Sequence, residues 1–155
     1  MKAFHCIALA LVLLSPAGPA LAASTSASAI PKAALVQPAE LAATLRNASA
    51  PKPLLLHVGF HVLYQQARIP GSEYVGPASE QAGLQLLRDR VAKLPRNTPI
   101  VVYCGCCPWG DCPNIAAAYE ALRALGFTNV KALYIAHNFG TDWMDQGHPV
   151  STRGS

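Results

Sequence analysis

The sequence has little charge and no concentrated patch of positive charge. Only 13% of its 155 residues are charged, with 12 Lys and Arg against 8 Asp and Glu. Neither Lys nor Arg forms the stripe that a phosphate backbone requires. We therefore expect no nucleic acid partner.

The sequence also lacks an apolar run long enough to span a membrane near its start. The run from Ile7 to Leu14 is far short of the roughly 20 apolar residues that cross a bilayer. It follows a single cation, Lys2, and leads to Ala20-Leu21-Ala22, a small-x-small pattern suited to signal peptidase. We predict that residues 1–22 are a cleaved signal peptide rather than a membrane anchor. The mature protein would be periplasmic or secreted, with no membrane span.

Outside the signal, cysteine is absent except in one short window. Cys104, Cys106, Cys107 and Cys112 all lie there. In an oxidising compartment, thiols this close tend to pair unless they hold a metal or take part in a redox cycle. Disulfides inside so short a window would constrain little of the unfolded chain. The cluster therefore predicts chemistry rather than stabilisation.

The remaining chain has the length of one domain, and no internal repeat divides it. Residues 23–32, rich in Ala, Ser and Pro, predict a flexible leader, residues 33–150 the domain, and residues 151–155 a C-terminal tail. Strands are predicted at 33–36, 54–58, 73–75, 99–103 and 130–135, and helices at 38–46, 79–94, 113–125 and 140–146. This alternation predicts an open, mainly parallel five-stranded α/β sheet with helices on both faces.

Three predicted strands end in potential ligands or nucleophiles. His57 ends the second strand, Cys104 follows the fourth, and His137 comes just after the last. Sites in open α/β sheets form at the carboxyl ends of the strands. We expect these side chains to converge there.

Four segments resemble the rhodanese-like family of sulfurtransferases. They are IPGS at 69–72, PIVVYC at 99–104, ALRALGFTNVKAL at 121–133 and DWMDQGHPV at 142–150, in the family's order and spacing. The resemblance covers nearly the whole predicted domain. It implies a rhodanese-like fold in a monomer that requires no cofactor.

The resemblance also implies a reaction. Cys104 matches the family's nucleophile, which accepts sulfane sulfur from a small donor as a persulfide and passes it to a thiol acceptor, including a thiol of a partner protein. Cys107 is a rival nucleophile, and Cys106 or Cys112 could act as a resolving thiol. Cys112 precedes Pro113, where a helix dipole favours a thiolate.

The loop after Cys104 departs from the family's pattern. It is longer than usual, and it carries Asp111 where a cation would attract an anionic donor. His57-Val58-Gly59 replaces the family's Asp-Val-Arg. Substrate contacts are predicted from Gly105, Trp109, Gly110 and Asn114.

Two other functions fit the same thiols. Soft thiolates with imidazoles suit copper or zinc, so the cluster could bind either metal together with His57, His61 or His137. The spacing of the cysteines is not that of a standard zinc finger. Disulfide exchange with a partner protein is the third possibility.

Overall fold

A parallel sheet of five strands forms the centre of the protein, in the order β1-β6-β5-β2-β4. The computed structural model describes residues 26–152, so the predicted signal 1–22 lies outside the described residues. The strands are β1 (Leu35–Val36), β2 (Leu54–His57), β4 (Glu73–Tyr74), β5 (Ile100–Tyr103) and β6 (Val130–Leu133). All neighbouring strands in this sheet are parallel, which confirms the predicted α/β sheet.

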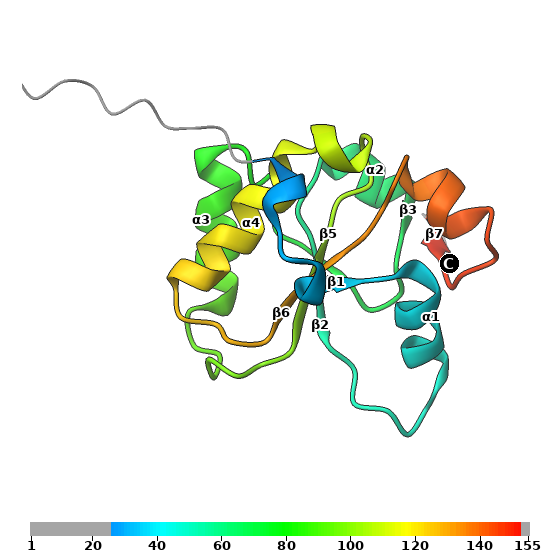
Figure 1. Cartoon of the computed structure of the whole chain (residues 1–155), viewed down its shortest axis with the longest axis horizontal. Helices are drawn as coiled ribbons and strands as arrows, with labels where there is room; N and C mark the ends of the chain where they lie inside the picture. Colours follow the sequence, from blue (N-terminus) through cyan, green and yellow to red (C-terminus); the bar gives the residue numbers. More distant parts are fainter. Residues whose placement is uncertain (1–25, 153–155) are drawn as a thin grey trace, which may run out of the picture.

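Helices cover both faces of the sheet, with α3 and α4 on one side and α1 on the other (Figure 1). Their bounds are α1 (Pro38–Arg46), α2 (His61–Gln66), α3 (Gln81–Val91) and α4 (Pro113–Ala124). Proline occupies the first turn of α1 and α4, where its missing N–H costs no hydrogen bond. In the described part of the chain, no helix combines the length and apolarity needed to cross a membrane.

Several elements differ from the sequence prediction, including the predicted strand 33–36, of which only Leu35–Val36 form β1. The short helix α2 was not predicted, because its segment has no clean apolar period. The segment Gly140–Met144 forms a π-helical turn rather than an α-helix to Gln146.

Alternation along β5 decides which way Cys104 faces. Successive side chains of a strand point to opposite sides of the sheet. Ile100 and Val102 therefore pack in the core beneath α3 and α4, whereas Val101 and Tyr103 pack on the α1 side. Cys104 continues the first set and lies against α4.

The ends of the domain are more ordered than the predicted boundaries suggest. Within the predicted leader, Ala27–Ala29 form a 3₁₀ turn, and the Ala27 side chain is fully buried. In the predicted tail, Ser151–Thr152 form β7, which pairs antiparallel with β3 (Ala67–Arg68). The folded domain thus extends beyond residues 33–150.

Candidate active site

The loop between β5 and α4 carries all four cysteines of the thiol cluster, Cys104, Cys106, Cys107 and Cys112. Gly105 turns the chain at its start with a φ of 81°, a value that favours glycine. A Cβ at Gly105 would lie 2.7 Å from the Cβ of Phe139, and the Gly105 carbonyl accepts a 3.1 Å hydrogen bond from the Phe139 N–H. Gly105 therefore holds the loop against the segment that follows β6.

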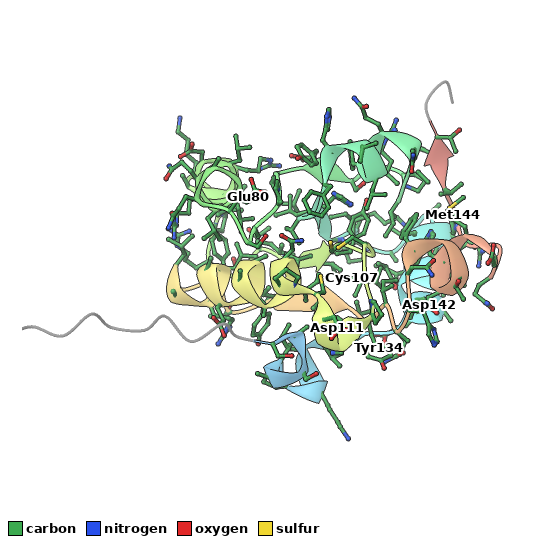
Figure 2. All side chains as sticks on the ribbon, turned by 90° about the horizontal axis from the view of Figure 1, so that it is seen from above. Glu80, Cys107, Asp111, Tyr134, Asp142 and Met144 are labelled. Atoms are coloured by element: carbon green, nitrogen blue, oxygen red, sulfur yellow. The ribbon has the colours of Figure 1, made fainter. Side chains whose placement is uncertain are left out.

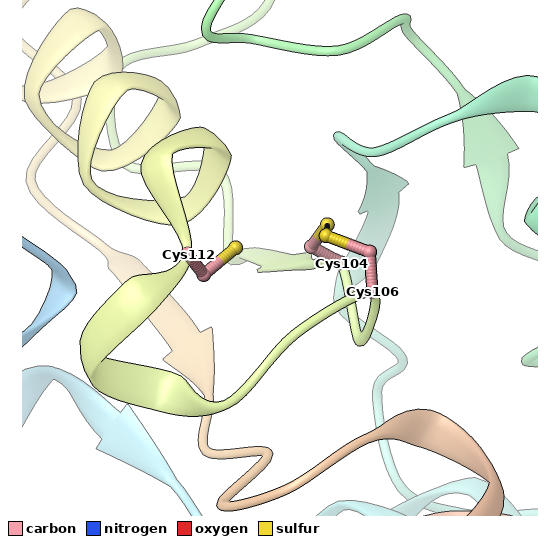
Figure 3. A group of neighbouring side chains, drawn as sticks. All are labelled: Cys104, Cys106 and Cys112. Carbon is pink, nitrogen blue, oxygen red and sulfur yellow. Dashed lines mark hydrogen bonds between the residues drawn. The ribbon is translucent and has the colours of Figure 1, made fainter.

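The sulfur atoms of the thiol cluster lie close together. Cys104 donates to the sulfur of Cys106 across 3.2 Å, and the sulfurs of Cys106 and Cys107 are 3.0 Å apart. The sulfurs of Cys104, Cys106 and Cys112 all lie within 4.8 Å of one another. Figure 3 shows Cys112 pointing from the start of α4 towards the other two. The predicted grouping of the thiols is therefore present.

Close packing surrounds the Cys104 sulfur. Asn114 donates to it across 3.7 Å and is itself held by the Ser79 N–H, 2.9 Å from its side-chain oxygen. A Cβ at Gly59 would lie 2.5 Å from this sulfur. Cys104 is only 2% exposed, whereas Cys106 is half-buried.

The contacts among the thiols place the first negative charge on Cys106. Hydrogen bonds from Cys104 and Cys112 lower the pKa of Cys106 to about 2. The same contacts and burial raise the pKa of Cys104, because a donated S–H keeps its proton. Burial and the contact with Cys106 raise the pKa of Cys107. For Cys112, contact with Cys104 lowers the pKa, but contact with Cys106 and burial outweigh this effect and raise it.

His57 lies beside the thiol cluster as a buried, neutral imidazole. Burial lowers its pKa to about 4, although a hydrogen bond with the Cys104 backbone opposes that shift. Its Nδ1 faces the Gly59 N–H at 3.4 Å. Backbone groups thus hydrogen-bond to the His57 ring. His57 therefore orients the end of β2 and does not offer a free nitrogen to the sulfurs.

His57 also belongs to a group of rings that we call the ring cluster: His57, Tyr64, Tyr74 and Tyr103. The Tyr103 hydroxyl is 2.7 Å from the Ser72 hydroxyl and accepts a 3.2 Å hydrogen bond from the Ile69 N–H. Since Ser72 donates to the Ile69 carbonyl, Tyr103 is the donor to Ser72. Burial raises the pKa of Tyr103 to about 12.

The other two predicted histidines do not join the thiols. His61 is exposed and lies against Tyr74, with ring centroids 4.6 Å apart. The His137 side chain is 71% exposed, and its Nδ1 is 3.1 Å from the Asp142 carboxylate. The expectation that all three strand ends converge is therefore wrong for His137, because its side chain faces solvent beside Asp142.

A cavity of about 320 Å³ opens beside Cys104 and Cys106. Its remaining lining combines strand-end, α2 and C-terminal residues: His57, Leu63, Gln66, Ala67, Gly105, Asn138, Phe139, Gly140 and Met144. Figure 2 shows Cys107 between the start of α4 and the segment that carries Asp142 and Met144. Sequence reasoning missed Leu63 and Gln66, because no period identified α2.

Two predicted substrate contacts, Trp109 and Gly110, are not among the residues lining this cavity. Trp109 packs against Tyr134, with ring centroids 5.1 Å apart, and lines a separate space of about 10 Å³. The Gly110 carbonyl accepts a 3.0 Å hydrogen bond from Ser26. Both residues thus hold the loop against neighbouring segments, Trp109 against Tyr134 and Gly110 against Ser26. Asn114 reaches the site only through Cys104, while Gly105 lines the cavity directly.

The amino-acid sequence matches a known protein family. The Rhodanese-like domain family matches residues 37–134. The chain belongs to the rhodanese-like domain family. This match confirms the resemblance found in the four sequence segments. The family is of the sulfurtransferase type.

Solved structures of other proteins share the fold at low sequence identity. The Alr3790 protein from Anabaena sp. is 21% identical, with a TM-score of 0.58 over 77% of this chain and 94% of that chain. The BH2092 protein from Bacillus halodurans is 19% identical, with a TM-score of 0.58 over 76% of each chain. A thiosulfate sulfurtransferase from Pseudomonas aeruginosa is 23% identical, with a TM-score of 0.56 over 77% of this chain but only 20% of its own length. No protein of curated function matches in sequence.

Proposed function

We propose that this rhodanese-like protein is an exported, monomeric sulfur carrier in which Cys106 accepts sulfane sulfur and Cys104 assists it. The observation that carries the proposal is the Cys104–Cys106 contact of 3.2 Å at the edge of the cavity. It stabilises a thiolate on the more exposed of the two residues. The thiolate is the form of cysteine that acts as a nucleophile. This proposal moves the nucleophile from the family's position, Cys104, to Cys106.

The transfer requires no cofactor and no change in the total number of electrons. The Cys106 thiolate attacks the outer sulfur of a donor persulfide, R–S–SH. The S–S bond of the donor breaks, R–S⁻ leaves, and Cys106 becomes Cys106–S–SH. The thiolate of an acceptor then attacks the outer sulfur in the same way and restores the Cys106 thiolate.

The cavity favours an organic persulfide over an inorganic anion as the donor. No Lys or Arg is present among the described residues that line it. His57, whose pKa is lowered to about 4, adds no positive charge near neutral pH. Leu63, Phe139 and Met144 provide apolar contact instead. An anion such as thiosulfate would lose hydration here without gaining an opposite charge.

Single-cysteine variants test the assignment of Cys106. Metal-free, reduced protein is incubated with a small organic persulfide, and intact mass is measured after rapid thiol blocking. We expect a product one sulfur atom heavier, with the added sulfur on the peptide that contains Cys106. Cys106→Ser should lower the rate of its formation at least about 100-fold. Cys107→Ser is the matched control and should change it less than about threefold, because the contact with Cys107 lowers the pKa of Cys106 less than the hydrogen bonds from Cys104 and Cys112 do.

The opposite result would return the role to the family's position. If Cys104→Ala abolished the added sulfur while Cys106→Ser kept it, Cys104 would be the acceptor. If neither substitution lowered the rate, sulfur transfer through this pair would be excluded.

Export is proposed from the pattern of residues 1–22. Expression of the full chain in a bacterial host should give a mature protein in the periplasm or medium that begins near Ala23. Recovery of a chain in the cytoplasm that still starts at residue 1 would contradict export.

A further inference from the structure

The sulfur atoms of Cys104, Cys106 and Cys112 have the spacing of a metal site. A metal–sulfur bond of about 2.3 Å places the three sulfurs of a planar trigonal site about 4 Å apart. The observed separations include 3.2 Å for Cys104 and Cys106, and none exceeds 4.8 Å. Shifts of under about 1 Å would therefore equalise them around one ion.

We infer that these three thiols form a binding site for a soft monovalent metal ion, Cu(I). The site is a second function of the same loop and does not depend on sulfur transfer. Cys104 comes from the end of β5, Cys106 from the loop and Cys112 from the start of α4, so the fold brings together ligands from three places (Figure 3).

The ligand set consists of sulfur alone. In the described part of the chain, no imidazole or carboxylate joins the three thiols. The backbone contacts of His57 and the outward position of His137 explain why the predicted imidazole ligands are missing. Thiolates without nitrogen or oxygen partners select soft ions such as Cu(I).

The number of ligands favours Cu(I) over Zn(II). Structural zinc sites are almost always closed by four ligands in a tetrahedron. Cys107 is 3.0 Å from Cys106 but lies outside the group whose sulfurs are all within reach of one another. Three ligands suit an ion that accepts a trigonal site.

Neighbouring donors can offset the negative charge of the bound thiolates. Asn114 donates its side-chain N–H to Cys104 across 3.7 Å. Cys112 is the N-cap residue of α4, where the helix dipole favours negative charge. Cys104 and Cys112 are only 2% and 3% exposed, so water has little access to compete for the ion. On binding, the thiol protons pass to solvent, and neither copper nor sulfur changes oxidation state.

Competition with a coloured Cu(I) chelator tests the site. Reduced, metal-free protein is titrated under anaerobic conditions, with no sulfur donor present. We expect one Cu(I) per chain. Cys112→Ser should weaken binding at least about 100-fold, because loss of a ligand exceeds the roughly 10- to 100-fold cost of losing an outer partner. Cys107→Ser, the matched control, should change affinity less than about threefold.

X-ray absorption on the wild-type complex provides a measurement that does not depend on variants folding. It should show three sulfur neighbours around copper and no imidazole. The inference is overturned if the protein withdraws no Cu(I) from the chelator, if Cys107→Ser weakens binding as much as Cys112→Ser, or if stoichiometric Zn(II) resists replacement by Cu(I). Because this assay uses no sulfur donor and the persulfide assay uses metal-free protein, either proposal can fail without the other.

Discussion

The thiol cluster and the ring cluster lie at the same edge of the sheet but are held in different ways. Tyr103, a member of the ring cluster, and the buried Ser72 beside it satisfy each other and the backbone of Ile69 with hydrogen bonds of 2.7 to 3.2 Å. The buried sulfur of Cys104 contacts other sulfurs and one amide at 3.7 Å. Neutral hydrogen bonds with good geometry stabilise a fold, whereas a shared thiol proton supports a thiolate. The ring cluster therefore stabilises the domain, whereas the adjacent thiol cluster can react.

The largest expected effect concerns His57 and stability in acid. Its pKa of about 4 in the folded protein lies below the usual histidine value of 6.5. As pH falls from about 6.5 to about 4, the unfolded chain binds a proton that the folded chain does not, so stability decreases by about 3 kcal/mol. Denaturant unfolding at several pH values should show this slope.

His57→Gln provides the control for that slope. His148, whose pKa is also lowered, is present in both proteins, so the difference between their curves isolates His57. Parallel curves would mean that His57 is not a neutral, buried member of the ring cluster.

A somewhat smaller effect is expected on the pH dependence of sulfur transfer. In the wild type, the Cys106 thiolate is populated throughout the neutral range, so the rate should change less than about twofold between pH 6 and pH 8. Cys104→Ala removes one of the two main hydrogen-bond donors to Cys106, so the rate should rise with pH over that interval, up to the roughly 75-fold gain of a cysteine with the usual pKa of 8.5. Thiol blocking at timed intervals, followed by mass spectrometry, can measure the rate of sulfur transfer in both proteins. A flat profile in Cys104→Ala would show that Cys104 does not sustain the charge.

Tyr103→Phe should affect stability more than reaction. It removes one hydroxyl and leaves the buried Ile69 N–H without its partner, at a cost of about 2 kcal/mol. Sulfur transfer at neutral pH should stay within about twofold, because the hydroxyl contacts Ser72 and Ile69 rather than sulfur. Chemical denaturation and the persulfide assay check the two parts. A large loss of transfer with unchanged stability would reverse the proposed division between the clusters.

The smallest expected effect comes from Gly59→Ala, which disturbs the thiols without removing one. The added Cβ would lie 2.5 Å from the Cys104 sulfur, so that thiol must rotate away and lose its contact with Cys106. We expect transfer to slow about tenfold, equivalent to 1.4 kcal/mol. Gly110→Ala is the matched control, since its Cβ would meet only the Ser28 hydroxyl at 3.7 Å. Equal rates in the two variants would show that the close approach of the sulfurs is not required.

Much of the scaffold follows from patterns in the sequence, and some of the site does not. The apolar run at 54–58 and the β-branched run before Tyr103 predict strands, and proline at 38 and 113 predicts helix starts, because these signals are local. The helix α2 gives no such signal, and it supplies Leu63 and Gln66 to the cavity. Trp109 and Gly110, the predicted substrate contacts, do not line the cavity, and a loop sequence does not reveal which side of the loop faces it.

The sequence by itself determined the family, the parallel α/β sheet and the place of the cysteines at the end of a strand. It did so because periodicity, helix-start signals and motif order are properties of neighbouring residues. Only the tertiary structure decided how the four thiols differ. Burial of Cys104, the hydrogen bonds converging on Cys106, and the approach of Cys112 from α4 depend on distances between elements, and those distances determine which sulfur carries charge.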